Sequence, residues 1–144
     1  LLLGSGRPLL VVPYIDRRSF SARRIVICWD GRSAAARAVH DAMPFLHKAA
    51  GIDILVVDRD RTIAMNTPEA LKDHLARSGL NADVHYLFSH TSNIYDMILS
   101  FGADVGADML VMGGYGHSRL RERVLGGVTR GILETMTVPV LISH

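Results

Sequence analysis

The chain has 144 residues, of which 49% are hydrophobic and 21% are charged, and its formal net charge is +2. A disordered chain would be poorer in apolar residues and more one-sided in charge, so this composition indicates one globular domain with a hydrophobic core. The small net charge does not indicate nucleic-acid binding. A single cysteine excludes an internal disulfide and fits the cytoplasm, where we expect the protein to act.

The amino-terminal segment is apolar, but Arg7 and two prolines interrupt it well short of the roughly 20 residues that a membrane-spanning helix needs. We therefore expect no membrane partner. Residues 4–13 and 136–144 share a layout, in which a short lead-in and a proline are followed by an apolar strand. We expect residues 1–22 to be the last strand of a preceding copy of the domain plus a linker, and residues 23–144 to be the domain itself.

From residue 23 onward, short apolar runs alternate with segments of helical periodicity. The runs predict five strands, and the periodic segments predict four helices. The strands are expected at 23–30, 52–57, 82–90, 109–114 and 138–144, and the helices at 33–50, 67–78, 91–105 and 128–136. This alternation predicts an α/β fold with an open, mostly parallel five-stranded sheet and helices on both faces.

Polar residues predict where the helices begin. Ser33 is the expected N-cap of the first helix, and Thr67 followed by Pro68 that of the second. The third helix is expected to begin at Thr91 or Ser92. In the strand at 82–90, Val84, Tyr86 and Phe88 alternate with His85 and Leu87, which favours a place near the sheet edge.

Ligands of an open parallel sheet bind beyond the carboxyl ends of the strands, where the strand order reverses. Two segments are candidates to meet there: "WDGRS" at 29–33 and the glycine-rich stretch at 112–133. The helix after the glycines would present unpaired amides from Gly127, Val128 and Thr129, which attract an anion. Four arginines, at positions 119, 121, 123 and 130, add positive charge. Phosphate binding and a simple tight turn both remain open interpretations of these glycines.

The glycine spacing Gly113-x₂-Gly116-x₉-Gly126, after "LVMG" and before a helix that leads to "VPVLIS", resembles the universal stress protein family. "IVICWDGRSAAARAV" is similar to the first strand and turn of that family, and the resemblance extends over residues 23–144. It implies a Rossmann-like fold that binds ATP or another adenine nucleotide, with Mg²⁺ as a candidate companion ion. The repeated layout of 4–13 resembles the tandem-domain branch of the family.

The resemblance also implies roles for individual residues. Asp30 would face the adenosine, and either Val56 or Val57 would line the adenine pocket. The loop would contain Met112, Gly113, Gly116 and His117, and the phosphates would meet Gly126, Gly127, Val128 and Thr129. The family pattern has serine or threonine at the position of Gly127, so one hydroxyl contact is absent, typically worth about 1 kcal/mol. Backbone amides and Thr129 are expected to compensate.

Several of these residues also have a plain structural interpretation, and no catalytic or metal site is expected. Asp30 precedes Gly31, a pair typical of turns. His117 adjoins Ser118, but no carboxylate is placed to support them as a catalytic pair. His40 and His47 are seven positions apart on one helix, too far to share a metal ion.

Without a general base or nucleophile, the expected function is that of a cytoplasmic stress-response protein that binds its nucleotide as a regulatory ligand, at most a slow ATPase. The alternative is an interaction module of the same fold that binds no nucleotide. The final strand, if unpaired at the sheet edge, invites association. We expect it to pair antiparallel with the corresponding strand of another domain, giving a homodimer or a tandem pseudo-dimer, and residues 7–13 are a candidate to supply that strand.

Overall fold

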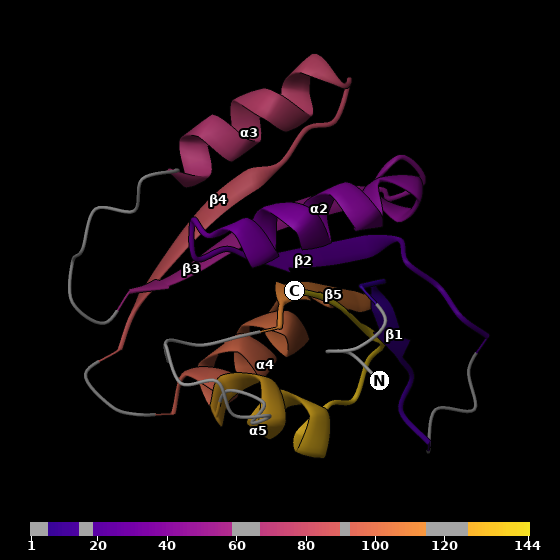
Figure 1. The fold of residues 1–144 in the computed structure, drawn as a ribbon, viewed down its shortest axis with the longest axis vertical. Helices are drawn as coiled ribbons and strands as arrows, with labels where there is room; N and C mark the ends of the chain where they lie inside the picture. The colour runs from indigo at the N-terminus through magenta and orange to yellow at the C-terminus, as the bar shows by residue number, and fades with distance from the viewer. Residues whose placement is uncertain (1–5, 15–18, 59–66, 90–92, 115–126) are drawn as a thin grey trace.

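A computed structural model of the chain describes residues 6–14, 19–58, 67–89, 93–114 and 127–144. Figure 1 shows a central sheet between two layers of helices. The elements within these ranges follow in the order β1 (Leu9–Val11), β2 (Arg24–Cys28), α2 (Ser33–Leu46), β3 (Gly51–Asp58), α3 (Pro68–Arg77), β4 (Asp83–Phe88), α4 (Ile94–Asp104), β5 (Met109–Gly113), α5 (Gly127–Thr135) and β6 (Val140–Ser143).

The strand order in the sheet is β1-β6-β5-β2-β3-β4, and all neighbours are parallel except β1 and β6. The predicted α/β class with a mostly parallel sheet is therefore confirmed, and β4 lies at an edge as expected. The strand count was wrong, because the sheet has six strands instead of five. The additional strand is β1, which pairs antiparallel with β6 in the register Leu9 to Ile142 and Val11 to Val140. This pairing supplies hydrogen-bond partners to a strand that would otherwise be an open edge.

Side chains alternate between the two faces of each strand, so the sheet has a separate hydrophobic core on each face. Helices α2 and α3 cover one face, where Ile27 and Ile54 are among the buried residues. Helices α4 and α5 cover the other face, where Leu55 and Leu110 pack around Ile132 of α5. Figure 1 shows the two helix pairs on opposite sides of the strands, as the sequence pattern predicted.

The helix starts confirm one predicted cap and correct others. Thr67 caps α3, since its Oγ1 accepts a hydrogen bond from the amide of Ala70 at 3.2 Å. Ser33 was wrong as a cap, because it is the first residue of α2 and Arg32 holds the N-cap position. Asn93 is the N-cap residue of α4, whereas Thr91 and Ser92 lie outside the described residues.

Among the residues that the structure describes, none of the helices combines the length and the apolar character needed to cross a membrane.

Candidate functional site

The strand order places the reversal of the sheet between β2 and β5. The chain leaves β2 toward β3 and β4 on one side, and then crosses to β5 and β6 on the other, where β1 from the start of the chain forms the edge. Neighbouring parallel strands that diverge in this way leave a crevice at their carboxyl ends, where ligands of such sheets bind. Cys28 of β2 pairs with Met112 of β5 just before that edge. The two segments predicted from the sequence, 29–33 and the residues after 112, thus leave the sheet on adjacent strands.

Gly113, at the end of β5, lies directly against the first turn of α2. A Cβ atom at this position would be 2.7 Å from the backbone nitrogen of Ala35 and 2.9 Å from the carbonyl carbon of Ala34. Backbone atoms cannot move aside as a flexible side chain can, so only glycine allows β5 to end this close to α2. Met112 and Gly113 are the last two residues of β5, which confirms the strand predicted at 109–114 and corrects their assignment to the loop by the family resemblance, and Met112 is buried in the core on the α4 and α5 face.

Asp30 follows β2 and forms a turn with the residues that begin α2. Its Oδ1 accepts a hydrogen bond from the backbone amide of Arg32 at 3.0 Å, and Gly31 has a φ of +74°. The structural interpretation of Asp30 as a turn residue is therefore confirmed. The side chain is also exposed, so this carboxylate stands at the carboxyl edge of the sheet, close to the start of α2.

Helix α5 is described from Gly127 to Thr135, which includes the predicted start at Val128. A Cβ atom on Gly127 would have no atom of the described residues within 4 Å. The first amides of a helix lack partners within the helix and carry partial positive charge. Thr129 is only 2% exposed, which argues against a direct contact between its hydroxyl and a ligand. Gly127 and Val128 are thus the more accessible of the three predicted residues.

Val56 and Val57 near the end of β3 point to opposite faces of the sheet. Val56 packs against the core on the α2 and α3 side, and Val57 packs against the core on the α4 and α5 side. Because α5 lies on the second side, Val57 shares a face with the start of that helix. The sequence left the choice between the two valines open, and the geometry favours Val57.

The remaining predicted site residues, Gly116, His117 and Gly126, lie outside the described residues, as do three of the four arginines. The fourth, Arg130, donates a hydrogen bond from Nε to Oε1 of Glu134 at 2.7 Å, one turn along α5. This contact raises the pKa of the Arg130 guanidinium. Both side chains are more than half exposed, so the pair adds little to stability and leaves Arg130 near solvent.

A cluster of polar side chains around the buried carboxylate of Asp53, which the sequence did not predict, joins β2, β3 and β4. Asp53 is 1% exposed, and it accepts hydrogen bonds from Arg24 to both carboxylate oxygens, at 2.9 and 3.2 Å. Nε2 of His85 lies 2.9 Å from Oδ1 of the same carboxylate. The cluster raises the pKa of Arg24 through its contact with Asp53. A charged residue inside the apolar run "IDILVV" was the available signal, but its partners are 29 and 32 positions away.

This cluster is built from residues early in the three strands, at the end of the sheet away from the carboxyl edge. A buried carboxylate needs such partners because an unpaired charge in the core is costly. We interpret the cluster as a structural link between the strands.

In the part of the chain that the structure covers, His, Cys, Asp and Glu side chains do not form a group of three or more that could hold a metal ion.

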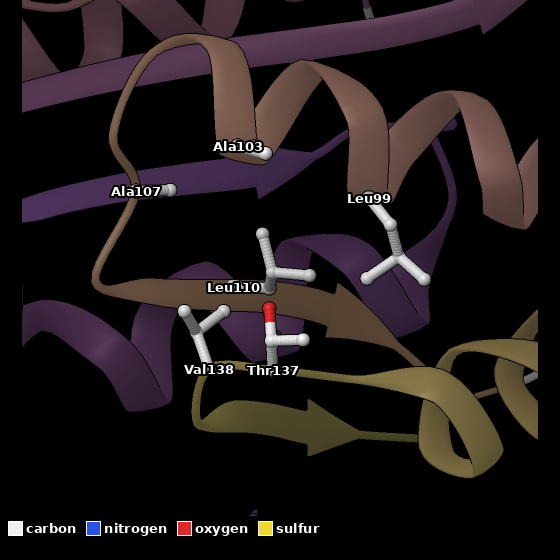
Figure 2. A pocket seen from close by; sticks show the side chains of 7 residues that line it. Leu99, Ala103, Ala107, Leu110, Thr137 and Val138 are labelled. Carbon is white, nitrogen blue, oxygen red and sulfur yellow. The ribbon is translucent and has the colours of Figure 1, made fainter. Parts of the chain in front are cut away.

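A small pocket lined mainly by apolar residues also lies away from the carboxyl edge. Figure 2 shows Leu99 and Ala103 of α4 on one side, with Thr137 and Val138, which lead into β6, on the other. Leu110, the second residue of β5, lies between them. The position beside the starts of β5 and β6 separates this pocket from the candidate nucleotide site.

Comparisons with known proteins agree on one protein family. A sequence model of the universal stress protein family matches residues 21–144. Universal stress protein Slr1230 of Synechocystis sp. is 26% identical over 141 residues, which are 94% of this chain and 46% of that protein. The chain thus spans about half the length of this curated relative.

Solved structures share the fold. The hypothetical protein MJ0577 has a TM-score of 0.72 and 24% identity, with coverage of 85% of this chain and 95% of that one. A universal stress protein from Archaeoglobus fulgidus has a TM-score of 0.79 and 18% identity, and the match covers 99% of this chain and 52% of that one. A universal stress protein solved in complex with cAMP has a TM-score of 0.58 and 21% identity, covering 86% and 99%. At these identities the three structures establish the fold alone.

Proposed function

The chain belongs to the universal stress protein family, and on that premise we propose that it binds an adenine nucleotide as a regulatory ligand at the carboxyl ends of β2 and β5. In this proposal the adenosine lies near Asp30 and Val57, and the phosphates lie at the start of α5. Nucleotide occupancy would change how the domain associates with partners in the cytoplasm, in the setting of a stress response.

The observation that carries the proposal is the contrast between the two helix starts at this edge. At the start of α2, the Asp30 carboxylate already accepts a hydrogen bond from the amide of Arg32 and adds negative charge. At the start of the described part of α5, Gly127 is exposed, and no atom of the described residues lies within 4 Å of where its side chain would stand. A phosphate is repelled by a carboxylate and attracted by accessible helix amides. The electrostatics therefore favour α5 for the phosphates and leave Asp30 for hydrogen-bond donors of the nucleoside.

The chemistry of the ligand is supported by the family. A solved relative binds cAMP, which carries an adenine, a ribose and a phosphate. The side chains around the proposed site offer no evident nucleophile or general base among the described residues, which favours a bound ligand over rapid turnover. Mg²⁺ is a candidate to accompany the phosphates, and slow ATP hydrolysis is the most activity that this arrangement supports.

A second function is favoured by one observation, the glycine at position 127. The family pattern has a hydroxyl there, and the burial of Thr129 makes it a poor replacement. The alternative is therefore an interaction module of the same fold that binds no nucleotide.

Calorimetric titration of the purified protein with ATP, ADP, AMP, cAMP and adenosine tests the proposal. We expect binding of adenosine that strengthens as phosphates are added, and no comparable binding of guanosine nucleotides. Absence of heat with all five ligands at millimolar concentration, together with no nucleotide released from the freshly purified protein in mass spectrometry, would establish the interaction module instead.

A further inference from the structure

Helix α5 packs closely against α4 through a contact between Gly131 and Tyr95. A Cβ atom on Gly131 would lie 2.5 Å from Cδ1, 2.6 Å from Cγ and 2.9 Å from Cε1 of the Tyr95 ring. Gly131 is buried, and Tyr95 is half-buried in the core on that face. The aromatic ring thus occupies the space that any other residue at position 131 would fill with its own side chain.

Local sequence preference does not explain this glycine. Glycine in a helix interior is less favourable than alanine, because it loses more conformational freedom on folding. Gly131 sits in the middle of α5 (Gly127–Thr135) and has no special backbone conformation to provide. Gly131 instead allows the two helices to approach closely, because the ring of Tyr95 packs directly on the backbone of α5.

The contact lies close to the proposed phosphate site. Gly131 is four residues from Gly127, which is about 6 Å along the helix axis. Tyr95 is the second residue of α4, so the contact holds α5 near the carboxyl edge of the sheet. A short helix behaves as a rigid unit over one turn, so a displacement at Gly131 is transmitted to the amides of Gly127 and Val128.

We propose that Tyr95 is a positioning residue for the nucleotide site, which sets the place of the α5 amides through its contact with Gly131. This inference rests on the proposed function for its ligand, but the contact itself is independent of it. Enlarging residue 131 pushes α5 away from α4 and shifts the helix start, while the adenosine side of the site, around Asp30 and Val57, is left in place.

The test compares the affinities for ATP and for adenosine in a double-mutant cycle. Gly131→Ala should weaken ATP binding about five-fold, the effect of one lost hydrogen bond, while the affinity for adenosine stays within about two-fold. Tyr95→Phe keeps the ring and should bind both ligands as the wild type does. In a Tyr95→Ala background, Gly131→Ala should have no further effect on ATP binding, because the ring that it displaces is absent.

Equal losses for ATP and adenosine, or an unchanged ATP affinity in Gly131→Ala, would overturn the positioning role. A second measurement separates this inference from the proposed function. The backbone amide NMR resonances of Gly127 and Val128 should shift in Gly131→Ala and not respond to the same change in the Tyr95→Ala background. If the wild type bound no nucleotide, the proposed function would fail and these resonances would still decide whether Tyr95 positions α5.

Discussion

Gly113 and Ala35 approach each other so closely that a Cβ atom on Gly113 would lie 2.7 Å from the backbone nitrogen of Ala35. This contact joins the end of β5 to the first turn of α2, the two elements that border the β2–β5 crevice. The packing requirement exists whether or not the loop after β5 binds phosphate, so Gly113 has a structural role in addition to any role at the ligand.

Gly113→Ala is therefore expected to lower the free energy of unfolding by about 1–3 kcal/mol, the usual cost of overpacking. It should also weaken ATP binding, because β5 or α2 must move. Urea unfolding and calorimetric titration measure the two effects. Wild-type stability in this variant would show that α2 adjusts freely and that the close contact has no energetic consequence.

Gly127→Ser restores the hydroxyl that the family pattern has at this position. Because a Cβ atom on residue 127 would have no atom of the described residues within 4 Å, the new side chain fits without moving any of them. We expect the affinity for ATP to rise about five-fold, equivalent to about 1 kcal/mol, and the affinity for adenosine to stay unchanged. Gly127→Ala is the matched control, since it adds the Cβ atom without the hydroxyl. A serine variant that binds ATP no better than the alanine variant would contradict the expected phosphate contact.

Gly102→Ala is expected to stabilise the protein. Gly102 lies inside α4 and lines the apolar pocket of Figure 2, and a Cβ atom there would be 3.6 Å from Cδ2 of Leu110 and 3.8 Å from Cβ of Ala107. These are ordinary contact distances, so the gain in helix propensity comes without a clash. The free energy of unfolding should rise by about 0.5–1 kcal/mol. Calorimetric melting would detect the higher Tm, and a lower Tm would show that the pocket cannot accept a methyl group.

The hydrogen bond between Tyr86 and Glu69 should make part of the stability depend on pH. The Tyr86 hydroxyl donates to Oε1 of Glu69 at 2.5 Å, which raises the pKa of Tyr86 to about 12 and lowers that of Glu69. Because both side chains are substantially exposed, Tyr86→Phe should cost only about 0.5 kcal/mol at pH 7.

The stability contributed by this hydrogen bond rises with pH at the acidic end of the range and falls with pH at the alkaline end. The lowered pKa of Glu69 gives stability that is present above its ordinary value of about 4.3 and is lost as the pH falls through the folded-state value. The raised pKa of Tyr86 gives stability that is present below its ordinary value of about 10 and is lost as the pH rises through about 12. Urea unfolding of wild type and Tyr86→Phe should therefore differ between pH 5 and 9 and converge at both extremes. A difference that persisted undiminished at pH 3 would refute this account.

Deletion of residues 1–13 removes β1 and leaves β6 with unpaired backbone groups along the edge that β1 now covers. We expect the shortened chain to associate more strongly than the full chain, because open edges pair with one another. Light scattering coupled to size-exclusion chromatography measures the change. Val12→Ser is the control, since this exposed side chain follows β1 without taking part in the pairing. Identical oligomeric states of deleted and full chains would show that the β6 edge does not drive association.

Local sequence patterns were sufficient to predict much of the fold. Alternating apolar runs and helical periodicity predicted the order of β2 through β6, since these signals depend only on neighbours in the chain. Thr67 and Pro68 marked the start of α3 for the same reason, because a cap bonds to an amide three residues away. The spacing of the glycines, compared with a known family, indicated which edge of the sheet to examine.

The candidate site was predicted in part. The positions of Asp30, Gly113 and Gly127 at the carboxyl edge follow from the parallel strands that the alternation predicted, whereas the order of the strands in the sheet came from the structure. The choice between Val56 and Val57 needed the faces of the finished sheet, and the burial of Thr129 needed the packing of α5 on α4.

Three glycines show what the sequence determined and what it could not. Gly102, Gly113 and Gly131 are the same residue type in the chain, and local propensity alone would favour alanine at the two helical positions. The structure assigns them different environments: ordinary contacts at Gly102, a backbone contact at Gly113 and an aromatic ring at Gly131. The Asp53 cluster likewise joins residues 29 and 32 positions apart. Periodicity and capping act between near neighbours and can be read from the chain, whereas close approach depends on which distant segments the folded sheet and helices bring together.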